Sequence, residues 1–208
     1  MGSERRGIGR PIRMALRIAK LLVFVGMTFA VSVASAAEDA APKVSFQTNL
    51  GEIVFELDRE HAPATVANFL RYVTEGHFDG TVFYRVVPGF VIQAGSFDAE
   101  GKPRGVHDPI PLETATTPSN TRGTMAMGHG DDPNSARAEF FINLADNKAL
   151  DRQPDDLDNK TGFAAFGHVA TGMEVVDAIA ALPLGGVGPF PGAAPLTPAV
   201  IQKASVLK

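Results

Sequence analysis

The sequence predicts a mainly β fold: a closed eight-stranded antiparallel barrel capped by two α-helices. About eight short runs are rich in β-branched and aromatic residues, which is typical of strands. Only two stretches place apolar residues at the spacing of a helix face. Glycine (21) and proline (15) together exceed a sixth of the 208 residues, which favours many turns over a helical bundle. Because a barrel of this size is filled by its own side chains, we expect any ligand site on its outside or rim.

The predicted elements follow one another without an internal repeat. Residues 43–48 and 52–57 alternate in polarity and form the first hairpin. The first helix opens at residues 62–65 and stops at Gly76, and its apolar stripe predicts that it covers part of the barrel. The second helix spans residues 172–182. The remaining strands are expected at 83–87, 90–97, 123–128, 139–144, 163–169 and 200–207.

The first 36 residues have the layout of a secretory signal peptide. Six basic residues precede an apolar run over residues 21–33, and small residues up to Ala36 fit a cleavage site. The run is shorter than the roughly 20 residues of a membrane span, and an uncleaved anchor is the alternative. We expect cleavage after Ala36, export to the periplasm, a flexible lead over residues 37–42 and one domain over 43–208. Translation would start at Met1 or Met14.

Charge and composition exclude several kinds of function. Without residues 1–36 the chain keeps 13 basic and 22 acidic residues, a net charge of −9. Such a domain is not expected to bind nucleic acid, whose affinity comes largely from Lys and Arg. The absence of cysteine excludes disulfides and thiol chemistry. The five histidines lack metal-ligand spacing, and no nucleophile elbow or phosphate loop is present, so no metal or cofactor is expected.

One apolar stretch, residues 83–97, carries two isolated polar side chains. It is typical of a strand, a Pro-Gly turn and a second strand, with Arg85 in the first strand and Gln93 in the second. A guanidinium and an amide beside Phe90 and Val91 suit a pocket for an uncharged ligand with carbonyl groups. Taken alone, the stretch favours the plainer interpretation, in which Arg85 faces outward from its strand in a surface ion pair.

Four segments together resemble the cyclophilin family of peptidyl-prolyl cis-trans isomerases, and most closely its bacterial exported members. Residues 83–95 (FYRVVPGFVIQAG) resemble the signature around the family's catalytic arginine. Residues 123–127 (GTMAM) and 139–143 (EFFIN) resemble its other active-site segments, and residues 166–173 (FGHVATGM) resemble its strand before the last helix. The resemblance implies the barrel described above and catalysis of X-Pro bond rotation in proline-containing polypeptides.

The resemblance also implies roles for individual residues. Arg85 would be the catalytic group, and Gln93 would hydrogen-bond the substrate backbone. The proline ring would lie in an apolar socket lined by Phe90, Val91, Phe141, Leu150 and Phe163. Ala126 and Met127 would lie along the peptide groove, with Met127 offering its main chain.

Glu139 stands where the family often has glutamine. An acid there could pair with Arg85 and restrain it, in which case Glu139→Gln would raise kcat/KM. Glu139 also keeps open an alternative function, a proline-peptide binding or chaperone module with weak or no catalysis. With either function we expect a monomer that does not insert stably into the membrane after cleavage.

Overall fold

The structure is a computed structural model that describes residues 41–153, 161–186 and 189–208. The predicted signal peptide and most of the lead lie outside the described residues. Two α-helices are present, α1 (Pro63–Thr74) and α2 (Met173–Ala180), and two 3-10 turns lie in predicted loops, η1 (Pro133–Ser135) and η2 (Lys148–Leu150). The eight strands are β1 (Lys43–Thr48), β2 (Gly51–Leu57), β3 (Arg85–Val87), β4 (Val91–Ala94), β5 (Thr124–Met127), β6 (Phe140–Asn143), β7 (Ala165–Thr171) and β8 (Ile201–Leu207). Each lies within two residues of its predicted position, apart from β4, which ends three residues earlier than predicted.

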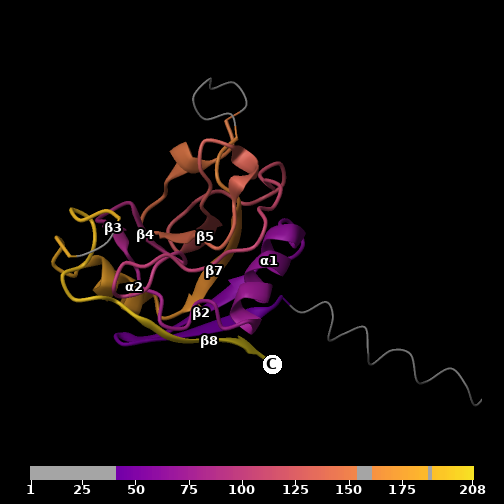
Figure 1. The fold of residues 1–208 in the computed structure, drawn as a ribbon. Coiled ribbons are helices and arrows are strands. Elements are labelled where there is room, and N and C mark those ends of the chain that lie inside the picture. Colours follow the sequence, from indigo (N-terminus) through magenta and orange to yellow (C-terminus); the bar gives the residue numbers. More distant parts are fainter. Residues whose placement is uncertain (1–40, 154–160, 187–188) are drawn as a thin grey trace, which may run out of the picture. The chain divides into compact units, whose positions relative to one another are not determined.

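All eight strands form one antiparallel sheet in the order β3-β4-β6-β5-β7-β2-β1-β8 (Figure 1). The predicted closed barrel is wrong in one respect, because no ladder joins the edge strands β3 and β8 within the described residues. The chain before β3 is joined to the start of β8 by an isolated bridge between Val82 and Val200 and by backbone bonds that link residues 80–83 to residues 199–201. β3 has three residues, and its free edge meets the loop before β8 instead of β8 itself. There, Val86 N donates to Ala193 O at 2.8 Å. The sheet is therefore curled but open.

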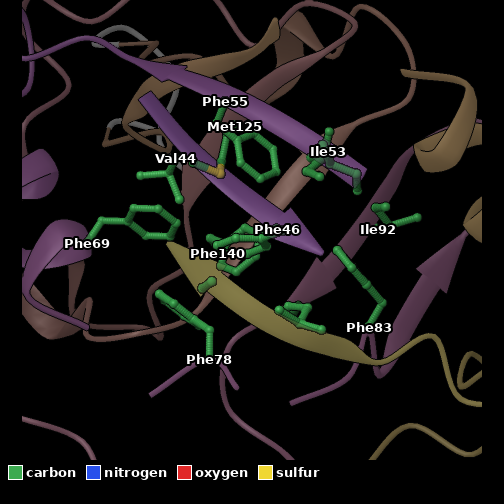
Figure 2. Packing of buried hydrophobic residues seen from close by; sticks show 14 of the residues in the cluster. Val44, Phe46, Ile53, Phe55, Phe69, Phe78, Phe83, Ile92, Met125 and Phe140 are labelled. Carbon is green, nitrogen blue, oxygen red and sulfur yellow. The ribbon is translucent and has the colours of Figure 1, made fainter. Parts of the chain in front are cut away.

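Successive side chains of each strand point to opposite faces of the sheet, and this alternation separates two apolar clusters. The large core holds a group of phenylalanine rings whose centroids lie 5.0–6.0 Å apart, namely Phe46, Phe69, Phe78 and Phe140 (Figure 2). The smaller cluster contains Val91, Ala126, Phe141 and Ala165. Neighbouring residues in one strand enter different clusters, as Phe140 and Phe141 do in β6. A residue of the small cluster therefore belongs to the face opposite the core.

Helix α1 is held at its start by a residue distant in sequence. Pro63 is a suitable first residue, but Ala62 at the N-cap provides no side-chain acceptor. The Glu113 carboxylate takes that role, because it accepts from Ala64 N at 3.1 Å and from Thr65 N at 2.8 Å. A negative charge is also favourable beside the positive end of the helix dipole.

The helices cover different parts of the sheet. α1 packs on β8, whereas α2 contacts β2, β3 and β4 (Figure 1). The predicted apolar face of α1 is confirmed, because Val66, Phe69 and Val73 are buried in the large core. No helix within the described ranges is long and apolar enough to cross a membrane.

Candidate active site

The candidate site is built on one row of cross-strand neighbours. Arg85 in β3 pairs with Gln93 in β4, Gln93 pairs with Phe141 in β6, and Phe141 pairs with Ala126 in β5. Directly paired residues have their side chains on the same face of a sheet. The ladder thus brings a guanidinium, an amide and an aromatic ring into line, although they come from separate parts of the sequence.

This row opens into a pocket of about 230 Å³. The volume is below the 300–1,000 Å³ or so that is usual for drug-sized ligands, so the pocket suits a single side chain or ring. Its apolar wall consists of Phe90, Val91, Phe141, Leu150 and Phe163. Its polar edge consists of Arg85, Gln93, Gly128, His129 and Glu139. The structure therefore brings together eight of the ten residues singled out in the sequence.

The other two predicted residues lie beneath the pocket rather than on its wall. Ala126 is fully buried in the same apolar cluster as Val91 and Phe141, so it forms part of the floor. Met127 is 2% exposed and its side chain belongs to the large core. Its main-chain N donates to Ala164 O at 3.1 Å, so this N–H is already bonded to the segment before β7.

Gln93, and not Glu139, is the direct partner of Arg85. Arg85 Nη1 donates to Gln93 Oε1 at 2.8 Å. Gln93 Nε2 in turn donates to Glu139 Oε1 at 2.9 Å and to the Tyr84 hydroxyl at 3.1 Å. The possible Arg85–Glu139 ion pair is not formed, and none of the salt bridges among the described residues involves Arg85. The guanidinium charge therefore stays unneutralised beside the apolar pocket.

Burial raises the pKa of the Glu139 carboxyl group above its ordinary value of 4.5. An acid whose pKa is higher in the folded than in the unfolded state holds its proton more tightly when folded. Ionisation of Glu139 then favours unfolding, and its contribution to stability falls as pH rises from 4.5 through the raised pKa.

We expect Glu139→Gln to stabilise the protein at pH 7, with a gain over wild type that shrinks towards pH 4. The neutral amide avoids the desolvated charge, and its oxygen can still accept from Gln93. Urea unfolding of both proteins across this pH range measures the gain. Because Gln93 separates the two side chains, kcat/KM should stay unchanged, and an increase would show that Glu139 restrains Arg85 through Gln93. An equal stability difference at both pH values would contradict the role of the buried charge.

A buried polar network supports the apolar wall from behind. Asn147 Nδ2 donates to Phe90 O at 2.9 Å, and Asn120 Nδ2 donates to Phe163 O at 3.1 Å. Asn143 connects the two, since it donates to Asn120 Oδ1 at 3.1 Å and accepts from Asn147 at 2.8 Å. These bonds fix the backbone of two pocket residues that lie in loops.

His129 is a pocket residue that the sequence analysis did not select. Its ring stacks on Phe163 with centroids 4.4 Å apart and planes at 17°. Its Nε2 lies 2.9 Å from Gly162 O, so it joins the loop after β5 to the loop before β7. Its place directly after the predicted strand 123–128 was the available signal. The described part of the chain contains no group of three or more His, Asp or Glu side chains placed to hold a metal ion.

Comparison with known proteins gives a consistent answer. The family model for "Cyclophilin type peptidyl-prolyl cis-trans isomerase/CLD" matches residues 43–206. "Peptidyl-prolyl cis-trans isomerase A" of Dickeya dadantii is 39% identical over 195 residues, which cover 94% of this chain and 100% of the relative. "Peptidyl-prolyl cis-trans isomerase B" of Escherichia coli is 42% identical over 145 residues, 70% of this chain and 88% of the relative.

The fold is also found among solved structures. The crystal structure of a cyclophilin-type peptidyl-prolyl cis-trans isomerase from Cryptosporidium parvum aligns with a TM-score of 0.66 at 21% identity, over 81% of this chain and 98% of that one. This likeness concerns the fold. Together with the family match over nearly the whole described domain, it leads to one conclusion: the chain belongs to the cyclophilin-type peptidyl-prolyl cis-trans isomerase family.

Proposed function

We propose that this peptidyl-prolyl cis-trans isomerase rotates X-Pro bonds in exported proteins, with Arg85 as the catalytic group and the apolar pocket as the proline socket. The observation that carries the assignment is an arginine that has no carboxylate partner among the described residues and lies at the edge of a small apolar pocket. An uncharged ring would enter the pocket while its amide bond stays beside the guanidinium.

The barrier to rotation explains why an arginine is sufficient. Conjugation of the amide nitrogen gives the C–N bond double-bond character and a barrier of about 18–20 kcal/mol. In the twisted transition state this conjugation is lost, and the proline nitrogen can accept a hydrogen bond. A preorganised donor at that nitrogen stabilises the transition state more than the planar ground state. Arg85 can supply such a donor without any covalent step.

The remaining residues would bind and orient the peptide. Phe90, Val91, Phe141, Leu150 and Phe163 would surround the proline ring. Gln93 uses its amide nitrogen on Tyr84 and Glu139, whereas its Oε1 accepts from Arg85 alone among the described residues. Since an amide oxygen has two lone pairs, Gln93 can accept one further bond from a substrate N–H.

Three parts of the chain would serve export and catalysis. Residues 1–36 would be a signal peptide, residues 37–42 a lead and residues 43–208 the isomerase domain, which would act as a periplasmic monomer. In support, the described domain begins its first strand at Lys43. Mass spectrometry of protein recovered from the periplasm tests this division, since an intact N-terminus would indicate the uncleaved anchor.

An isomerase assay tests the activity directly. The exported protein is expected to accelerate the cis-to-trans rotation of a short Ala-Pro peptide, whose uncatalysed isomerisation takes tens to hundreds of seconds. Peptide binding without acceleration would instead support the proline-peptide binding module.

A further inference from the structure

We propose that Phe190, in the loop over residues 183–198, is a positioning residue that holds the Arg85 guanidinium for catalysis. The Arg85 Cζ atom lies 5.8 Å from the centroid of the Phe190 ring, within the range of a cation–π contact. The inference rests on the proposed function, in which Arg85 is the catalytic group. It adds a residue from a loop that belongs to no strand or helix of the site.

Phe190 completes a ring of four contacts around Arg85. Arg85 donates to Gln93, and Gln93 donates to the Tyr84 hydroxyl. Tyr84 stacks on Phe190 with ring centroids 6.1 Å apart and ring planes at 17°. Phe190 in turn contacts Arg85, which closes the cycle of contacts. Tyr84 is 2% exposed, so these contacts connect Arg85 and Phe190 to a residue that is buried in the domain.

The backbone around Phe190 is fixed to the free edge of β3. Phe190 O accepts from Ala193 N at 2.8 Å and from Ala194 N at 2.9 Å. Ala193 O accepts from Val86 N, the residue after Arg85. This short connection between the loop and β3 sets the Phe190 ring over the guanidinium. The open edge of the sheet is thus the reason that the loop can reach the catalytic residue.

A ring face holds an arginine without using its hydrogen-bond donors. A guanidinium carries five N–H groups, and Gln93 takes a bond from Nη1 only. A carboxylate partner would take one or two more donors and neutralise the charge. The Phe190 ring lies beside the Arg85 Cζ atom, so it can limit the rotamers of the long Arg85 side chain and leave the remaining donors for the substrate. The contact with Arg85 also explains why a phenylalanine that is 45% exposed lies at position 190.

Substitutions that separate ring character from size test the proposal. We expect Phe190→Leu to lower kcat about two- to fivefold with little change in KM, as befits the loss of a partly exposed cation–π contact. Phe190→Trp and Phe190→Tyr keep the ring and should retain wild-type kcat. In the Arg85→Ala background, Phe190→Leu should have no further effect. Wild-type kcat in Phe190→Leu, or an equal loss in the tryptophan and tyrosine variants, would overturn the proposal.

A measurement without turnover separates this proposal from the proposed function. The Arg85 side-chain protons should show ring-current shifts by NMR that vanish in Phe190→Leu and persist in Phe190→Tyr. Unchanged shifts in Phe190→Leu would overturn the contact itself. If the shifts behave as expected but Arg85→Ala retains full activity, the catalytic role of Arg85 fails and with it the positioning role of Phe190.

Discussion

Arg85→Ala is expected to lower kcat/KM for an Ala-Pro peptide by about 100- to 1,000-fold, the usual effect of removing one preorganised donor from a transition state. The loss should fall mainly on kcat, because the donor strengthens its contact only as the amide twists. A protease-coupled or NMR exchange assay of the exported protein measures it. Stability should change little, since Arg85 is half-buried and, among the described residues, its side chain hydrogen-bonds to Gln93 alone.

Arg85→Lys is the matched control for this substitution. Lysine keeps the positive charge but lacks the planar fork that meets Gln93 and the substrate together. We therefore expect activity between wild type and Arg85→Ala. Full activity in Arg85→Ala with an unchanged fold would remove Arg85 from the mechanism and leave the pocket as a binding site alone.

Phe140→Ala and Phe141→Ala are expected to damage different properties, although the two residues are neighbours in β6. Phe140 is fully buried among the aromatic rings of the large core. Its truncation leaves a cavity and should cost about 3–5 kcal/mol of unfolding free energy, a large share of the roughly 5–15 kcal/mol of a typical domain. Urea unfolding should show the loss in Phe140→Ala.

Phe141→Ala should instead weaken substrate binding. The Phe141 ring is part of the pocket wall, and burying a proline against it is worth about 1.5–3 kcal/mol. That corresponds to a fall in kcat/KM of about 10- to 100-fold, carried mainly by KM because the ring contacts the ground state and the transition state alike. A large stability loss with unchanged KM would place Phe141 in the core and contradict the proposed socket.

Local patterns were enough to predict the elements and most of the site. Alternation identified the strands, and the Pro88-Gly89 turn joins β3 to β4 so that Arg85 faces Gln93. The family resemblance added Phe141, Leu150 and Phe163, which line the pocket. It did not add His129, because its place directly after a predicted strand does not distinguish this histidine from the other polar residues of the same loop.

The prediction of a closed barrel was wrong, because closure depends on whether the two edge strands of the sheet pair with each other. Eight strands were expected to close, but strand count does not tell whether the first and last strands meet. β3 pairs with β4 on one side, and the loop before β8 occupies its other edge in place of β8 itself. Closure is a property of how all strands are staggered together, which no single segment encodes.

The strands, both helices and the family could be predicted from the sequence, because each depends on periodicity or on a short motif within one segment. Which group contacts Arg85 depends instead on the tertiary structure. Gln93 lies between Arg85 and Glu139, Phe190 lies over the guanidinium, and Glu113 caps α1 from a distant loop. These contacts join residues far apart in the chain, and hydrogen bonds and ring contacts act only over a few ångströms. They therefore exist only after register and loop packing have brought the partners together.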